Sequence, residues 1–168
     1  MHRLLIFCGL AFLLTGCLGY KVGPSNGMEA GSRSIEIAPP LNSTLEPRVS
    51  EEVSHALRKQ VQRDGTYKLN THGEGDVIVK TTVTMYDRSP LTFQPRDTLT
   101  VRDYRVQLIA FVNAYDRVTG KTLVNRQFKG ITTVRVGSDQ SSAERQALPL
   151  LAADLARAVT AAIVDGEW

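Results

Sequence analysis

Apolar and polar residues alternate along several stretches of the chain, as they do in strands that bury one face. Three such stretches, residues 76–87, 99–115 and 122–133, fill much of the second half, and a shorter one covers residues 34–38. The clearest alternation places one apolar set on the same side: Val106, Leu108, Ala110, Val112 and Ala114. The pattern therefore predicts four strands that belong to one sheet.

The segments between these strands carry residues that are typical of turns and loops. Residues 88–98 contain two prolines and are predicted to form a loop. Residues 116–121 read Asp-Arg-Val-Thr-Gly-Lys and predict a tight hairpin, with Gly120 where a positive φ is needed. Residues 99–115 and 122–133 are therefore expected to pair antiparallel.

Two stretches show apolar residues at helical spacing instead. Residues 47–63 repeat an apolar residue every four positions, at Val49, Val53, Leu57 and Val61, and Gly65 follows as a stop. The C-terminal stretch, beginning near Ser141, has an apolar stripe at Leu148, Leu151, Leu155, Val159, Ala162 and Ile163. Pro149 either kinks this helix or marks the start of its regular part.

The predicted element order is β-α-β-β-β-α. This order favours an α+β fold in which both amphipathic helices cover one face of a mostly antiparallel or mixed four-stranded sheet. We therefore expect a two-layer sandwich, with the other face of the sheet polar.

The N-terminus has the three parts of a secretion signal. Met1–Arg3 is positive, Leu4–Leu14 is an unbroken apolar run, and Thr15-Gly16-Cys17 ends it with small residues. The apolar run is too short to span a bilayer, which takes roughly 20 residues. We expect residues 1–16 to be removed, residues 17–33 to form a tether, and residues 34–168 to form a single domain.

Leu14-Thr15-Gly16-Cys17 resembles the lipobox of bacterial lipoproteins. The resemblance implies that the Cys17 thiol carries a covalent lipid that anchors the chain to a membrane, and that Leu18 directs it to the outer membrane, facing the periplasm. Two alternatives are an ordinary signal peptide with an incidental cysteine, and modification of Cys8 inside the apolar run.

Composition excludes several classes of function for the mature chain. Without the signal, which contains Arg3, 19 basic and 17 acidic residues remain, too even a balance to indicate nucleic-acid binding. Cys8 leaves with the signal and Cys17 is expected to be lipidated, so no thiol remains for a disulfide or a nucleophile. No hydrolase, phosphate-loop or zinc motif is present, and no enzymatic activity is expected.

The two histidines of the mature chain do not suggest a cofactor. His55 stands among polar residues of the first predicted helix and is expected on its surface. The run His72-Gly73-Glu74-Gly75-Asp76 could be drawn as a metal loop, but a turn before a strand is the simpler interpretation. We therefore expect no metal and no cofactor other than the lipid on Cys17.

Several motifs, taken in order, resemble the LPS-assembly lipoprotein family, LptE. Gly19-Tyr20 follows the lipidated cysteine, and the sequence Ile35-Glu36-Ile37-Ala38-Pro39-Pro40 with Asn42 and Thr44 is similar to the family's first strand. The Asp116–Lys121 hairpin is similar to the family's Asp-x-x-Thr-Gly-Lys turn. Pro40 replaces the usual aromatic residue, and Leu18 is an extra residue before Gly19.

The resemblance implies a non-enzymatic function at the outer membrane. Members of the family plug the lumen of the β-barrel LptD, help it to fold, and assist lipopolysaccharide transport to the cell surface. The alternative is a periplasm-facing lipoprotein subunit of another envelope secretion or transport assembly, because such proteins share the strand–helix opening.

Arginines gather around the predicted loop at residues 88–98: Arg88, Arg96, Arg102 and Arg105, with Arg135 after the last strand. Guanidinium groups bind phosphates in pairs of hydrogen bonds, and lipopolysaccharide carries phosphates. The family resemblance makes Arg88, Arg96, Arg102 and Arg135 candidate lipopolysaccharide-binding residues. The alternative is a solvated strand face or contacts to carboxylates of the barrel.

Overall fold

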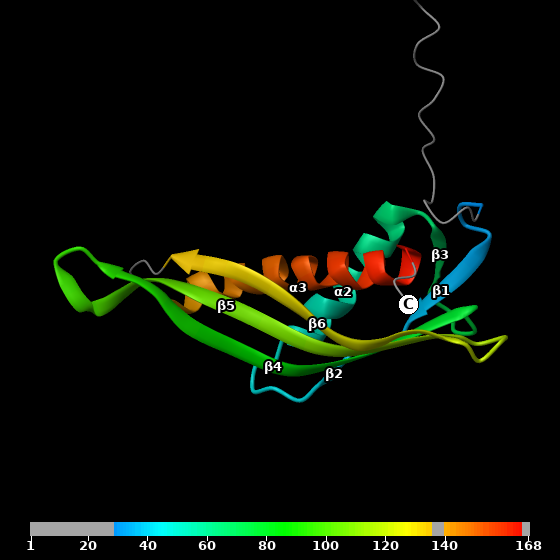
Figure 1. Ribbon diagram of the computed structural model, residues 1–168, viewed down its shortest axis with the longest axis horizontal. Coiled ribbons are helices and arrows are strands. Elements are labelled where there is room, and N and C mark those ends of the chain that lie inside the picture. Colours follow the sequence, from blue (N-terminus) through cyan, green and yellow to red (C-terminus); the bar gives the residue numbers. More distant parts are fainter. Residues whose placement is uncertain (1–28, 136–139, 166–168) are drawn as a thin grey trace, which may run out of the picture.

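The computed structural model describes residues 29–135 and 140–165, which form one open sheet and two helices (Figure 1). The elements in chain order are β1 (Arg33–Ile37), β2 (Leu41–Asn42), α2 (Val49–Asp64), β3 (Tyr67–Asn70), β4 (Val77–Gln94), β5 (Asp97–Asp116), β6 (Thr122–Arg135) and α3 (Gln140–Asp165). The predicted mixed α+β fold is therefore confirmed.

The sheet combines a parallel part with a long antiparallel part. Its strand order is β3-β1-β4-β5-β6, and β2 pairs with β4 beside this path. β1 runs parallel to both β3 and β4, whereas β4, β5 and β6 form an antiparallel meander. The hairpin turn after β5 contains Gly120 at φ +71°, as the sequence predicted.

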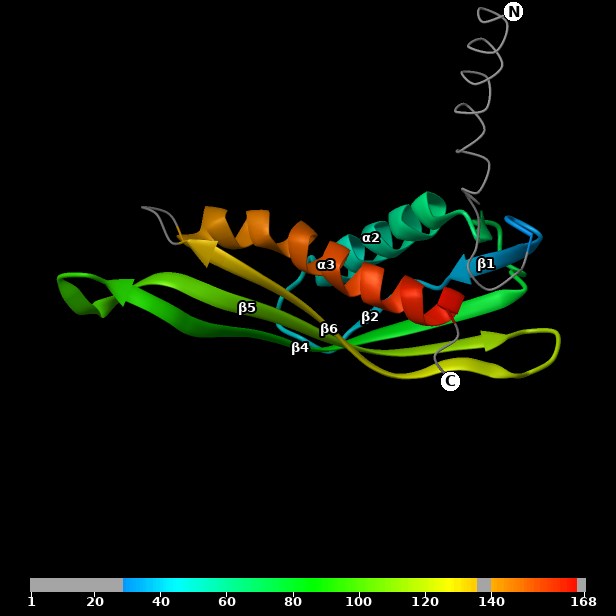
Figure 2. The same ribbon diagram turned by 45° about the horizontal axis from the view of Figure 1, so that its top comes forward.

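Both helices cover the same face of the sheet (Figure 2). The helix stripes predicted from the sequence are buried, and so is the alternating set of β5 from Val106 to Ala114. α3 crosses β6 so closely at Gly130 that a Cβ there would lie 2.4 Å from the Leu151 carbonyl oxygen. Because Gly130 has no side chain, α3 can pack closely against β6 at this point.

Residues Arg145–Asp165 of α3 are long and apolar enough to cross a membrane by length and composition. Most of this stretch is buried inside the protein, where it packs on β6, β5 and α2. A core helix passes the same length and composition test, so its apolar character is accounted for by the core.

Two short strands escaped the sequence prediction, which gave a four-stranded sheet where the described residues form six strands. β2 contains only two residues, too few for any alternation to show. β3 begins two residues after Gly65 and is held by parallel pairing with β1, in which Ile35 lies opposite Leu69. Such a strand depends on a partner far away in sequence, which local pattern does not reveal.

The prediction of a loop at residues 88–98 was wrong. β4 continues to Gln94 and β5 begins at Asp97, so that only Pro95 and Arg96 form the turn. Pro90 lies within the pairing, opposite Tyr104, and the register shifts just after it. Beyond Val83, β5 is the only described strand that pairs with β4, so its other edge is open; a proline is tolerated on an edge strand.

The structure also settles the place of Pro149. α3 already begins at Gln140, and Pro149 lies inside the helix on an exposed position. It therefore does not mark the start of the helix. The ring occupies the solvent side, while the neighbouring Leu148 and Leu151 are buried in the core.

Candidate functional site

The β4–β5 hairpin projects past the start of α3 as a two-stranded arm (Figures 1 and 2). We call residues 86–106 the arm; its outer part is two-stranded, and at its base β6 pairs with residues 103–106 of β5. The arm carries four of the five arginines that the sequence analysis singled out, and Arg135 lies opposite Asp103 on β6. The strand pairing therefore brings the candidate arginines to one end of the molecule, although not into one patch.

Asp103 organises two of these arginines. Its carboxylate accepts hydrogen bonds from Arg102 Nε at 2.9 Å and from Arg135 Nε at 3.0 Å, and another from the Thr92 hydroxyl. Asp103 is buried, and these bonds, that of Thr92 foremost, hold the pKa of its carboxyl well below the usual range. The carboxylate therefore stays charged and ties β4, β5 and β6 together.

The charges of Arg102 and Arg135 are shared with this carboxylate. Two guanidinium groups face one carboxylate, so the cluster keeps one net positive charge. The side chain of Arg135 is 75% exposed and that of Arg102 is 43% exposed. Both can still bind an anion from solution, but the Nε of each guanidinium already donates a hydrogen bond to Asp103.

Arg96 and Arg105 are exposed and differ from this pair. Among the residues that the structure describes, neither side chain has a hydrogen bond or ion pair. Arg96 is one of the two turn residues at the apex of the arm, and Arg105 lies opposite Ser89 and Thr133 on the face of the sheet away from the helices. Arg96 was one of the four candidate binding residues and Arg105 was not, yet the full charge of both side chains is available to a ligand.

Arg88 occupies a third place. It lies opposite Val106, on the side of the sheet that the helices cover, and lines a hollow of about 440 Å³ at the edge of β4. The hollow is completed by Ser43, Thr44, Leu45, Glu46, Thr84, Met85 and Tyr86. Arg88 is therefore separated by the sheet from Arg105.

The two tyrosines of the arm serve mainly as packing. Tyr86 and Tyr104 are half-buried and pack against the hydrophobic core. Tyr86 also lines a second hollow of about 330 Å³, together with Glu46, Pro47, Arg48, Glu52, Arg145 and Leu148. Their rings are not free platforms for stacking on a sugar.

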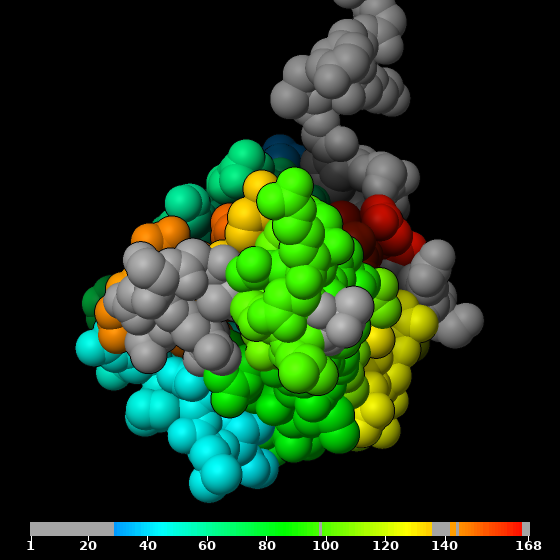
Figure 3. Space-filling view, turned by 90° about the vertical axis from the view of Figure 1, so that its left-hand side faces the viewer, coloured from blue at the N-terminus to red at the C-terminus, as the bar shows by residue number. Residues whose placement is uncertain are grey.

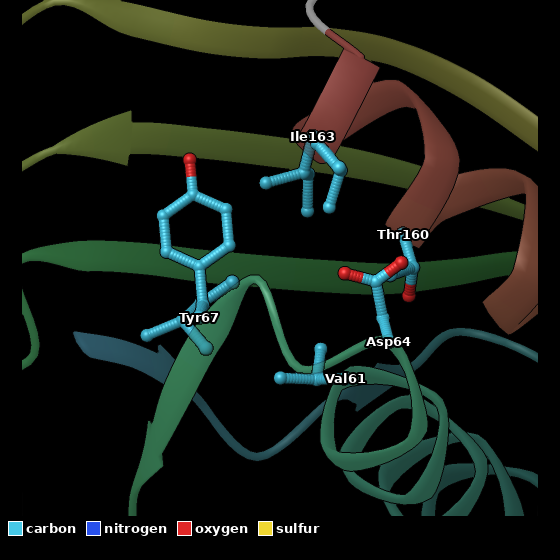
Figure 4. A pocket seen from close by; sticks show the side chains of 7 residues that line it. Val61, Asp64, Tyr67, Thr160 and Ile163 are labelled. Carbon is cyan, nitrogen blue, oxygen red and sulfur yellow. The ribbon is translucent and has the colours of Figure 1, made fainter. Parts of the chain in front are cut away.

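An apolar crevice lies at the other end of the core, between β1, β3 and the two helices (Figure 4). It is lined by Ile35, Val61, Asp64, Tyr67, Thr160, Ile163 and Val164, and it has no room for a water molecule. Burial raises the pKa of the Tyr67 hydroxyl. The crevice is a gap in packing and offers nothing that could hold a ligand.

The histidines are placed as the sequence analysis expected. His55 is exposed on α2, and His72 lies in the turn before β4, where its backbone N–H donates to the Asn70 side chain at 2.9 Å. The carboxylate of Asp76, at the end of that turn, accepts hydrogen bonds from the backbone N–H and the hydroxyl of Ser34. Within the described parts of the chain, no group of three His, Cys, Asp or Glu side chains could hold a metal ion.

Two features of the site were not found from the sequence. Asp103 stands next to Arg102 in an alternating strand, and only the β5–β6 register reveals Arg135 as its second partner. The exposed apolar residues Leu91 and Phe93 were hidden by the prediction of a loop at residues 88–98, and the pattern gave no sign that Leu99, at the start of the next predicted strand, is exposed. Cys8 and Cys17 lie outside the described residues.

Comparisons with known proteins give one family match and several solved structures of similar fold. The family model described as LptE, lipopolysaccharide-assembly, matches residues 32–163. No curated protein sequence matches the chain. A hypothetical protein from Chlamydia trachomatis has a similar structure, with a TM-score of 0.60 at 9% identity over 82% of this chain and 98% of that one.

Two further solved structures are similar. A minor lipoprotein from Acinetobacter baumannii has a TM-score of 0.52 at 13% identity, over 79% of this chain and 93% of that one. A PelC dodecamer from Paraburkholderia phytofirmans has a TM-score of 0.51 at 13% identity, over 86% of this chain and 95% of that one. At such identities the likeness shows the fold alone.

Proposed function

The chain belongs to the LptE lipopolysaccharide-assembly family, and on that basis we propose that its mature form is an outer-membrane lipoprotein that plugs the barrel LptD. In this proposal it helps the barrel to fold and assists lipopolysaccharide transport to the cell surface, without catalysing a reaction. The family match over residues 32–163 is the observation that carries it.

The proposed anchor is a lipid on Cys17, at the end of the signal. One acyl chain holds a protein only marginally, whereas two or three chains make attachment effectively permanent. Residues 18–28 separate Cys17 from the first described residue. At roughly 3.3 to 3.6 Å per extended residue, this segment allows the domain to stand up to about 40 Å from the lipid.

The shape of the domain supports residence in a wide barrel. A barrel lumen is polar and water-lined, so its plug must keep polar surface outside and bury its apolar surface within itself. Here the helix-covered face of the sheet contains the core, while the opposite face carries Lys80, Asn113, Gln107 and Lys129 among a few apolar residues.

The arm supplies the proposed contacts to lipopolysaccharide phosphates. Arg96 and Arg105 offer complete guanidinium groups, and Arg102 and Arg135 add the donors that Asp103 leaves free. Arg88 is assigned to a separate contact, since the sheet divides it from Arg105. A phosphate bound bidentately by an arginine gains direction as well as charge.

The alternative is a lipoprotein subunit of another envelope assembly. The likeness to a PelC dodecamer indicates that a similar fold also occurs in a multi-subunit assembly. The family match favours the barrel, because it rests on the sequence and the likeness to the dodecamer rests on the fold alone.

Extraction of native membranes in mild detergent tests the proposal. The tagged protein should co-purify with a large outer-membrane barrel, and the barrel should fail to mature when the protein is depleted. Elution of the protein alone, with normal barrel maturation in the depleted strain, contradicts the proposal. A ring- or pore-forming partner, without lipopolysaccharide binding, would favour the alternative.

A further inference from the structure

β6 forms one border of the sheet and leaves backbone groups open along its first half. Among the described strands it pairs with β5 alone, and the register is unbroken from Val124 to Arg135. This first half runs along the free side of the sheet in Figure 2, and its yellow surface lies at the border of the molecule in Figure 3. We call residues 124–130 the β6 edge.

One hydrogen bond shows which residues of β6 face away from β5. The Ile131 N–H donates to the Asp154 carboxylate of α3 at 3.0 Å, so it points outward from the sheet. Bonded and non-bonded positions alternate in an antiparallel pair, so the backbone groups of Asn125, Gln127 and Lys129 point outward as well. Within the described chain, these outward groups have no hydrogen-bond partner.

The border of β6 is closed at Ile131 and open before it. Asp154, which also accepts a hydrogen bond from Arg157 Nη2 at 2.6 Å, covers the Ile131 N–H. Asn125, Gln127 and Lys129 are exposed. An uncovered sheet edge is a template on which another extended chain can pair, and most proteins blunt such edges. Here α3 blunts only the part of β6 that it crosses.

The other borders of the sheet suit strand addition less well. β3 has only four residues. The open edge of β4 is interrupted by a register shift between Val83 and Met85, and it contains Pro90, which has no N–H to donate. The β6 edge contains neither a proline nor a register shift. It is therefore the border on which a regular strand can be added.

The charge of this border indicates which kind of strand fits. The facing stretch of β5, residues 108–114, is uncharged. Lys129 lies on the open face of the sheet, and Arg126 lies over the Phe128 ring at 5.0 Å on the other face. The strand itself has no carboxylate; α3 contributes Asp154, which is bonded as described, and Asp165 at its end. An added strand therefore meets a basic residue on each face.

This pattern favours a foreign strand over a second copy of the same edge. Two β6 edges side by side would bring like charges together, which destabilises a strand pair, whereas carboxylates opposite Lys129 and Arg126 would stabilise it.

We propose that the β6 edge binds an extended, acidic segment of a partner protein, which adds to the sheet as a further strand. The outward backbone groups of Asn125, Gln127 and Lys129 supply the hydrogen bonds, and the two basic side chains select for carboxylates. In the proposed plug this edge is open to a loop of the barrel, so the two proposals are compatible, but the inference does not rest on that function.

A peptide probe tests the proposal on the mature lipidated protein in detergent. The probe is the capped peptide Thr-Glu-Val-Glu-Val-Thr, which favours extended structure, and Thr-Lys-Val-Lys-Val-Thr is its matched basic control. Exchange of amide protons with water is measured by NMR for each residue. At saturation, the acidic peptide should slow exchange at Asn125, Gln127 and Lys129 by about fivefold or more, and the basic peptide should not. Thr133, which faces outward beyond Asp154, should not change.

Two variants separate strand addition from attraction by charge. Gln127→Pro removes an outward N–H without removing a bond to β5, and it should abolish the slowing; Thr133→Pro makes the same change beyond the β6 edge and should not. Lys129→Glu leaves the backbone intact and should weaken binding of the acidic peptide about twofold to fivefold, with a matching gain for the basic one.

Three results overturn the inference: no slowing by the acidic peptide, equal slowing by both peptides, or slowing that survives Gln127→Pro. A fourth is a doubled particle size with these amides protected before peptide is added, because a second copy would then occupy the edge. Co-purification with a barrel enters none of these measurements, so the two proposals can fail separately.

Discussion

Gly130 of β6 lies directly beneath the backbone of Leu151 in α3, and an added Cβ would come within 2.4 Å of the Leu151 carbonyl oxygen. A methyl group there must push strand and helix apart, since backbone cannot swing away as a side chain can. We expect Gly130→Ala to lower the free energy of unfolding by about 1–3 kcal/mol, as overpacking does.

Urea unfolding followed by circular dichroism measures this effect. Lys129→Ala, on the neighbouring exposed position of the same strand, should change the stability by less than about 0.5 kcal/mol. A Gly130→Ala variant as stable as the control would mean that α3 does not rest on β6 as closely as the structure has it.

Pro149 gives the opposite expectation. It lies on the exposed side of α3, nine residues after the helix begins at Gln140, and it removes one hydrogen bond of the helical ladder. Pro149→Ala restores the N–H and should raise the free energy of unfolding by about 1–3 kcal/mol. A differential scanning calorimetry scan should show a higher Tm; a lower one would mean that the proline ring stabilises α3 in its place on the sheet.

Local pattern was sufficient for the parts of this fold that bury one face. The alternation around Val106 to Ala114 and the four-residue spacing of Val49 to Val61 both identified core residues correctly. The burial of these residues can be predicted from the apolar and polar pattern of their neighbours in the sequence. The stop at Gly65, with φ +75°, and the hairpin glycine at 120 were found for the same reason.

The sequence pattern failed to predict the parts of the fold that depend on pairing with a strand distant in the sequence. β3 exists because it pairs with β1, and the arm exists because β5 pairs with β4 past Pro90 despite the proline. The candidate arginines were identified from their residue type and their place in the sequence. Which of them form an ion pair depends on Asp103 and on the strand register that places Arg135 opposite it. No single stretch of sequence contains that register.

The Arg33–Asp116 pair predicts how stability changes in acid. The backbone N–H of Thr119 and, after it, the Arg33 guanidinium at 2.6 Å lower the pKa of Asp116 to about 2, against the opposing effect of burial. A lowered folded pKa means a contribution that is complete above about pH 5 and is lost as the pH falls from about 4 through 2.

Asp116→Asn removes that titration. We expect the variant to be less stable than the natural protein by about 1–2 kcal/mol at neutral pH, with the difference shrinking toward zero near pH 2. Urea unfolding at a series of pH values measures it, with Glu51→Gln on the exposed start of α2 as control. A difference that stays constant with pH would show that the Asp116 charge does not contribute to stability.

Asp103 is expected to control the order of the arm. Asp103→Asn leaves Arg102 and Arg135 without their ionic partner, so the join between β5 and β6 at the base of the arm weakens. Because the arm projects beyond the core, the loss should appear as faster amide hydrogen exchange in residues 90–104, with little change in the core strands. Ser89→Ala, an exposed change on the same arm, should leave the exchange unaltered, and equal exchange in both variants would refute the role of Asp103.

The division of the arginines predicts which substitutions separate binding from folding. A basic side chain near an anionic surface contributes about 1 kcal/mol, or about a fivefold change in affinity. Arg96→Glu with Arg105→Glu should therefore weaken binding of lipopolysaccharide about twentyfold or more while the Tm stays within experimental error, since neither side chain is tied to another described residue. Arg102→Glu should lower both affinity and order of the arm, because it places a second carboxylate beside Asp103. Lys59→Glu with Arg63→Glu, at exposed positions of α2, changes the net charge by the same amount, and equal weakening by this distant pair would mean that the arm has no special part in binding.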